Sequence, residues 1–189
     1  VSRLDGEPAF AELFFDDCLV HVDNRLGDEG AGWNVAMATA SSERGLNLRA
    51  PGRFLAAATQ LVGLYRALLD EKNEIPQELR NEVVDGYVAA QAYRWQVFSK
   101  ASALMHGSNM GAEASYMKIF WSELDVDLHA TALRLLADQA ELVLDAPDAY
   151  SEGSWMSGYL FSLAGPIYAG TNEIQRNIVA ERVLGLPRK

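Results

Sequence analysis

The sequence predicts a mainly α protein, an antiparallel four-helix bundle that follows a short N-terminal β remnant. From Gly32 onward, apolar residues recur at helical spacing in three runs of about 30 residues joined by short connections. The preceding segment differs, because "FAELFFDDCLVHV" contains short runs of strand-favouring residues between "LDGEP" and the glycine-rich "LGDEGAG". We therefore expect two short strands and a loop in residues 1–31, followed by helices in residues 32–189.

The first helical run starts near Trp33 and ends at "EKNEIP". Pro51 interrupts it, so we expect a kink or a short break near residues 48–52. Pro76 suits the first turn of the next helix, because its missing N–H has no partner there in any case. The apolar face of the first run comprises Phe54, Ala58, Leu61, Val62, Tyr65, Leu68 and Leu69.

The later helices follow the same pattern. The second run keeps its period from Leu79 to Leu104 and stops at "HGSN", and the third is expected over roughly residues 111–143. After the loop "DAPDAYSEGS", a short helix near 155–164 and a last helix near 171–184 complete the set, the last being the fourth bundle member. We interpret these apolar faces as core packing.

The composition argues against several classes of function. A formal net charge of −10 disfavours nucleic acid or an anionic membrane surface as a partner. Cys18 is the only cysteine, which excludes an internal disulfide and indicates a reducing compartment. No apolar run approaches the ~18 residues of a membrane span, and "VSRLDGEPAF" does not read as a signal peptide. We therefore expect a cytoplasmic protein without a membrane span.

One stretch, "PIYAGTNEIQRN" at residues 166–177, could carry chemistry. Gly170 gives a flexible approach, and Thr171 is a good N-cap for the last helix. A capped helix N-terminus suits phosphate, although an ordinary cap that serves only the helix is the alternative. Glu173 disfavours direct phosphate contact because it is negative, but it could accept a hydrogen bond from a sugar hydroxyl or an adenine amine.

Two stretches resemble the acyl-CoA dehydrogenases. "YAGTNEIQRNIVAERVLGLPR" is similar to their C-terminal signature, and "FAELFFDDCLVHVDNRLGDEGAGW" resembles the segment that joins their middle β-domain to their C-terminal helical domain. The resemblance covers nearly the whole chain. It implies that residues 1–31 end the β-domain, that residues 32–189 form the C-terminal bundle domain, and that the chain is a fragment that is inactive alone.

The resemblance also implies the chemistry. These enzymes remove a proton from the α carbon of an acyl-CoA thioester and pass a hydride from the β carbon to FAD, in fatty acid or sterol degradation. An electron-transfer flavoprotein is then the expected electron acceptor. In many members the base is a glutamate immediately before the Gly-Thr of the signature, where this chain has Ala169.

A substitute base is available in "GWNVAMATASSERG". In the isovaleryl-CoA branch of the family, the base lies at the position that matches Glu43, and a small residue lies where Ala169 is. The resemblance therefore implies Glu43 as the α-proton base, the alternative being a solvated carboxylate beside Arg44. The remaining assignments are Arg44, Tyr168, Ala169 and Gly170 as active-site support, and Thr171 and Glu173 as flavin contacts.

Other candidates are weaker. His21, His106 and His129 lie far apart and lack metal-ligand spacing, so no metal site is predicted. Lys118, in "ASYMKIFWSE", matches a recurring family lysine that we interpret as structural.

The expected partner is a related subunit. Many homotetrameric members carry an Arg-x-x-Phe-Gly stretch that grips the neighbouring subunit's FAD, whereas "LLDEKNEIPQELR" has no such motif. This departure favours a hetero-oligomer, like the mixed members that act on sterol-derived thioesters, over a homo-oligomer. Two rival functions stay open at this point: a non-catalytic subunit that completes a partner's FAD site, and a plain helical oligomerisation module.

Overall fold

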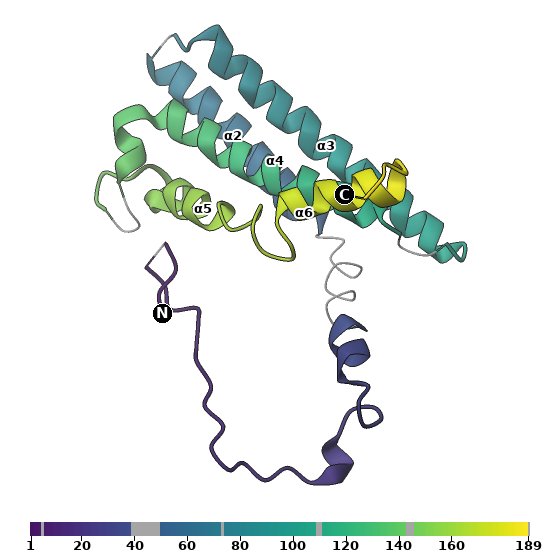
Figure 1. The fold of residues 1–189 in the computed structure, drawn as a ribbon. Helices are drawn as coiled ribbons and strands as arrows, with labels where there is room; N and C mark the ends of the chain where they lie inside the picture. The colour runs from purple at the N-terminus through teal and green to yellow at the C-terminus, as the bar shows by residue number, and fades with distance from the viewer. Residues whose placement is uncertain (5, 39–49, 73, 109–110, 143–145, 189) are drawn as a thin grey trace. The chain divides into compact units, whose positions relative to one another are not determined.

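The computed structural model describes the chain apart from residues 5, 39–49, 73, 109–110, 143–145 and 189. It divides into two compact units, Val1–Asn47 and Leu48–Lys189. The described part is mainly helical, which confirms the predicted fold class (Figure 1). None of its helices is long and apolar enough to cross a membrane.

The prediction of two N-terminal strands is wrong for the described residues of 1–31. An isolated antiparallel bridge joins Ser2 and Pro8, and a 3-10 helix covers Val22–Asn24. Strand propensity reflects packing against neighbouring strands and a core, and an isolated strand pair is marginal in water. The described residues of this unit form no such core, and Phe14 and Phe15 are 87% and 78% exposed. Residues 32–38 are helical, as predicted.

Three long helices form the second unit: α2 (Pro51–Lys72), α3 (Gln77–Met105) and α4 (Glu113–Leu136), which lie side by side in Figure 1. The short connections make each helix antiparallel to the next. Pro51 begins α2, because its fixed φ suits a first helical turn. Of the predicted kink or break near 48–52, residues 48 and 49 lie outside the described part, Ala50 is not helical, and Pro51 starts α2.

The third helix ends earlier than predicted, at Leu136. Ala137 has a φ of 51°, a left-handed conformation that stops an α-helix, and a 3-10 helix follows over Ala137–Glu141. A 3-10 turn over Tyr150–Gly153 then leads to the short helix α5 (Ser154–Ser162). The last element, α6 (Asn172–Ile178), continues as a π-helical turn over Val179–Val183. Both α5 and α6 pack against α4, so together they take the fourth position of the bundle.

Aromatic side chains connect the centre of the bundle to the loop before α6. Phe54 and Tyr93 are fully buried and meet edge to face, with ring centroids 5.2 Å apart. The ring of Trp121 lies 6.1 Å from that of Phe54 and 5.9 Å from that of Tyr168. Core packing thus anchors the loop that carries the candidate site.

Candidate functional site

The predicted site residues Tyr168, Ala169, Gly170 and Thr171 lie in a tight turn before α6, and Glu173 lies in the first turn of that helix. Ala169 and Gly170 both have left-handed backbone conformations, with φ of 56° and 87°. For alanine this conformation costs roughly 1–2 kcal/mol, so surrounding contacts have to maintain it. Gly170 is required, because a Cβ there would lie 2.6 Å from Nε2 of Gln175.

Gln175 supplies those contacts. Its side chain is only 1% exposed, and its Nε2 donates to the carbonyl oxygens of Ala169 at 3.0 Å and Gly170 at 3.3 Å. The backbone N–H of Asn172 donates to the carbonyl of Pro166 at 2.8 Å and closes the turn. Buried polar groups of α6 therefore fix the strained backbone at residue 169.

Asn172, 3% exposed, joins the turn to α4. Its Oδ1 accepts a hydrogen bond from Nζ of Lys118 at 2.7 Å, and its Nδ2 donates to Oε1 of Glu123 at 3.2 Å. The Ser122 hydroxyl lies within hydrogen-bond distance of both amide atoms. Burial lowers the pKa of Lys118, against the opposing charges of Glu173 and Glu123.

The sequence did not point to Asn172, Gln175 or Ser122 as members of the site. Polar residues on an amphipathic helix usually face water, so periodicity alone treats them as surface. The available signal for Lys118 and Ser122 was their four-residue spacing, which places both on one face of the helix beside Ala114 and Val126.

Thr171 caps α6, as predicted, with its Oγ1 accepting a hydrogen bond from the Ile174 N–H at 3.4 Å. The pKa of Glu173 is lowered by hydrogen bonds that its carboxylate accepts from the Glu173 backbone N–H and from the Thr171 hydroxyl. The charges of Arg176 and Lys118 lower it further. The turn thus presents a hydroxyl beside an exposed carboxylate. This pair suits sugar hydroxyls or amines better than phosphate.

Glu43 and Arg44, the predicted base and its neighbour, lie outside the described residues. Their roles therefore stay predictions. The structure brings together the other assigned residues, Tyr168, Ala169, Gly170, Thr171 and Glu173, in this turn and the first turn of α6.

A second buried polar group lies where α2, α4 and α5 meet. Arg53 Nη2 donates to Oδ2 of Asp125 at 2.6 Å, and the guanidinium lies over the Phe161 ring at 5.3 Å. Nδ1 of His129 lies 3.5 Å from Oδ1 of Asp125. The Arg53 side chain is 38% exposed, whereas that of Asp125 is 2% exposed. This group connects three helices, and the sequence analysis missed it although Asp125 stands between the apolar residues Leu124 and Val126.

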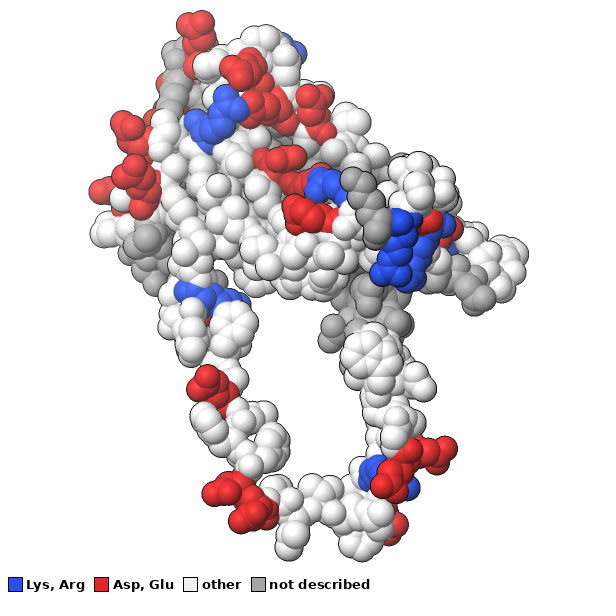
Figure 2. All heavy atoms as spheres, in the orientation of Figure 1, with Lys and Arg blue, Asp and Glu red and all other residues white. Residues whose placement is uncertain are grey.

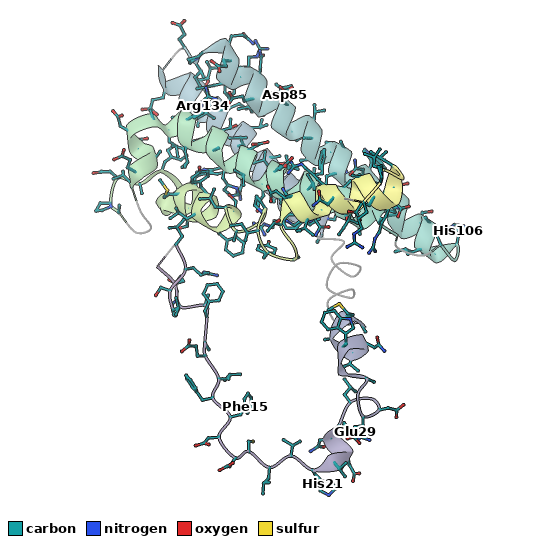
Figure 3. All side chains as sticks on the ribbon, viewed as in Figure 1. Phe15, His21, Glu29, Asp85, His106 and Arg134 are labelled. Carbon is teal, nitrogen blue, oxygen red and sulfur yellow. The ribbon has the colours of Figure 1, made fainter. Side chains whose placement is uncertain are left out.

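A surface hollow lies between α3 and α4. It measures about 390 Å³, and its lining mixes apolar residues with charged ones that include Asp85 and Arg134, labelled in Figure 3. Arg134 pairs with Glu82 and Glu78, so the hollow holds an ion-pair network. Acidic side chains predominate on the face in Figure 2, in keeping with the net charge of −10.

Across the described ranges, no group of three or more His, Cys, Asp or Glu side chains could hold a metal ion. The histidines are dispersed: Figure 3 labels His21 in the first unit and His106 beyond the end of α3, while His129 packs against Trp155.

Comparison with known proteins defines the class. Residues 30–184 match the family described as "Acyl-CoA dehydrogenase, C-terminal domain". The chain therefore belongs to the acyl-CoA dehydrogenase family, and the resemblance seen in its two motifs is confirmed.

Among curated relatives, the chain is 35% identical over 190 residues to acyl-CoA dehydrogenase IpdE1 of Mycolicibacterium smegmatis, covering 100% of this chain and 45% of the relative. It is 32% identical over 191 residues to acyl-CoA dehydrogenase IpdE1 of Mycobacterium tuberculosis, covering 100% of this chain and 47% of the relative. The chain thus spans about half the length of these relatives.

Solved structures share the fold. The "Tcur3481-Tcur3483 steroid ACAD G363A variant" matches with a TM-score of 0.82 at 20% identity, covering 100% of this chain and 49% of that chain. The ChsE4-ChsE5 complex from Mycobacterium tuberculosis matches with a TM-score of 0.75 at 25% identity, covering 90% of this chain and 45% of that chain. The placement of the base as in the isovaleryl-CoA branch stays a prediction.

Proposed function

We propose that this chain is the C-terminal part of an FAD-dependent acyl-CoA dehydrogenase that catalyses α,β-dehydrogenation of an acyl-CoA thioester. The observation that carries the proposal is the family match over residues 30–184, which includes the turn at Ala169 and Gly170. In this reading residues 1–31 end the middle β-domain, and residues 32–189 form the bundle domain. Bound FAD supplies the hydride acceptor of the reaction.

The proton transfer falls to Glu43. Removing the α proton needs a carboxylate beside the substrate, and Ala169 has no proton-accepting group. A small side chain at position 169 instead leaves space for a base that approaches from the first helix. Enclosure between an acyl chain and a flavin would disfavour the charged form of Glu43, raise its pKa and make it a stronger base near neutral pH. Arg44 beside it is assigned the role of orienting this carboxylate.

The hydrogen-bonding groups at the start of α6 suit a flavin nucleotide. Thr171 offers a hydroxyl, Glu173 offers an acceptor, and Gly170 has no side chain to obstruct a close approach to the backbone. We assign Thr171 and Glu173 as flavin contacts, with Tyr168 and Gly170 as support of the active site. The hydrogen bond between Thr171 and Glu173 means that a flavin would have to replace or share it.

For the assembly, we propose a related subunit as partner and a sterol-derived acyl-CoA as substrate. Three features support this proposal: the missing Arg-x-x-Phe-Gly stretch, the two-subunit name of the ChsE4-ChsE5 complex, and the steroid ACAD among the structures of the same fold. An electron-transfer flavoprotein is the proposed electron acceptor.

One observation favours a second candidate function. Because Ala169 removes the carboxylate from the signature position, the chain could serve as a non-catalytic subunit that completes the FAD site of a heteromeric dehydrogenase. Glu43 argues against this candidate, because a supporting subunit needs no base.

The test uses the FAD-loaded protein that contains this chain, produced alone and with a related subunit. Bleaching of the flavin by a panel of acyl-CoAs is followed for the wild type, for Glu43→Gln, and for Glu71→Gln as a matched control on an exposed helical glutamate. We expect wild type and control to bleach while Glu43→Gln binds FAD equally well and does not. Normal bleaching by Glu43→Gln would place the base elsewhere and favour the supporting subunit.

A further inference from the structure

We propose that Lys118 is a positioning residue, which acts through Asn172 to hold the Ala169–Gly170 turn in its left-handed conformation against α4. The catalytic part of this inference rests on the proposed dehydrogenase function, whereas its structural part does not.

The contacts form one continuous path. Lys118 Nζ lies 2.7 Å from Oδ1 of Asn172, and the Asn172 N–H lies 2.8 Å from the carbonyl oxygen of Pro166 at the start of the turn. Gln175, one helical turn after Asn172, holds the carbonyls of Ala169 and Gly170. Lys118, Asn172 and Gln175 are 6%, 3% and 1% exposed, so the whole path lies inside the protein.

The chemistry of the two neighbours fixes the orientation of the Asn172 amide. Lys118 can only donate, so it meets the carbonyl oxygen, and ionised Glu123 can only accept, so it meets the amide nitrogen. Ser122 tolerates either orientation, because a hydroxyl both donates and accepts. Lys118 and Glu123 together therefore decide which way the Asn172 amide points, and Lys118 supplies the donor.

A lysine is a costly way to fill this space. Burying an ammonium group disfavours its charged form, and a methionine of similar length would pack there without that penalty. The benefit lies in the turn, because the left-handed conformation of Ala169, with a φ of 56°, needs a rigid support. Without the Lys118 donor, only Glu123 and Ser122 remain to orient the Asn172 amide, and the support weakens.

The expected consequence concerns residue 169, which faces the substrate in the proposed function. A misplacement of about 1 Å near reacting groups can lower a rate by roughly 100-fold. A loosened turn should therefore slow flavin reduction by about tenfold or more, with the Kd of the acyl-CoA changed by less than about threefold.

The experiment compares Lys118→Met with Lys100→Met in the FAD-loaded protein that contains this chain. Lys100, on α3, is the matched control, a 21% exposed lysine whose ammonium pairs with Glu113 at 3.2 Å. The readouts are amide hydrogen exchange at residues 166–176 and the rate of flavin reduction at saturating acyl-CoA. We expect Lys118→Met to speed exchange about tenfold in residues 166–176 alone and to slow reduction, and the control to change neither.

Unchanged exchange and an unchanged reduction rate in Lys118→Met would overturn the proposal, even if Tm falls, because only a packing role would remain. If Lys118→Met fails to fold, Lys118→Gln replaces it, because glutamine keeps a donor without the charge. We expect Lys118→Gln to fold and to show slow exchange at residues 166–176, and rapid exchange in this variant would equally overturn the proposal. When Lys118→Met is combined with Asn172→Leu, the reduction rate should fall no further than in Asn172→Leu alone. Should the wild type fail to bleach at all, the dehydrogenase function falls, whereas the exchange data still decide whether Lys118 positions the turn.

Discussion

The Arg53–Asp125 pair makes an asymmetric prediction about stability. Arg53→Met removes the guanidinium that pairs with Oδ2 of Asp125, a side chain that is 2% exposed, and removing one partner of a buried pair costs about 3–5 kcal/mol. Asp125→Leu leaves a guanidinium that is 38% exposed and can turn to water, so its cost should be about 1–2 kcal/mol. For a protein of this size these values correspond to Tm decreases of roughly 6–20 °C and roughly 2–8 °C.

The assay is thermal and urea unfolding of both single variants and the double variant, followed by circular dichroism. The double variant should be more stable than Arg53→Met alone, because it also removes the buried carboxylate that has lost Arg53. Arg134→Met, which breaks a pair with a 50% exposed side chain, serves as the control and should show a small, salt-sensitive change. Equal costs for the two single variants, or simple addition in the double variant, would refute this reasoning.

Three further predictions follow from the turn and its support. Ala169→Gly should raise the free energy of unfolding by about 1 kcal/mol, because glycine adopts a φ of 56° without strain. An unchanged Tm would contradict the claim that Ala169 is strained. Gly170→Ala should lower the free energy of unfolding by about 1–3 kcal/mol, because the new Cβ would meet Gln175 and the residue would have a φ of 87°. An unchanged Tm in calorimetry would contradict this prediction. Burial lowers the pKa of Lys118 below its ordinary 10.5. Between these two values the unfolded chain binds a proton that the folded protein has lost, so the free energy of unfolding should rise with pH in that range. Urea unfolding across this range should show a flatter profile for Lys118→Met, and an identical slope would contradict the assignment.

The helices could be predicted from the sequence because periodic apolar residues, Pro51, Pro76 and the Thr171 cap each act locally. The end of α4 could not, since the left-handed conformation of Ala137 has no signature in an alanine. The N-terminal strands were predicted from propensity alone, and propensity cannot supply the neighbouring strands on which a sheet depends.

The part of the candidate site that is local in sequence was also predictable. The motif around Gly170 and Thr171 is contiguous, so its resemblance to a family could be read directly. The support from Lys118 and Ser122 spans about fifty residues of chain, as their hydrogen bonds to Asn172 show, and only folding brings them together.

The most direct test of the central claim moves the base from position 43 to position 169. In the FAD-loaded protein, flavin bleaching by acyl-CoA is measured for wild type, Glu43→Gln, and Glu43→Gln combined with Ala169→Glu. The account predicts that Glu43→Gln abolishes bleaching and that a glutamate at position 169 restores a measurable part of it. Bleaching at the wild-type rate in Glu43→Gln would contradict the claim that Glu43 compensates for the carboxylate missing at Ala169.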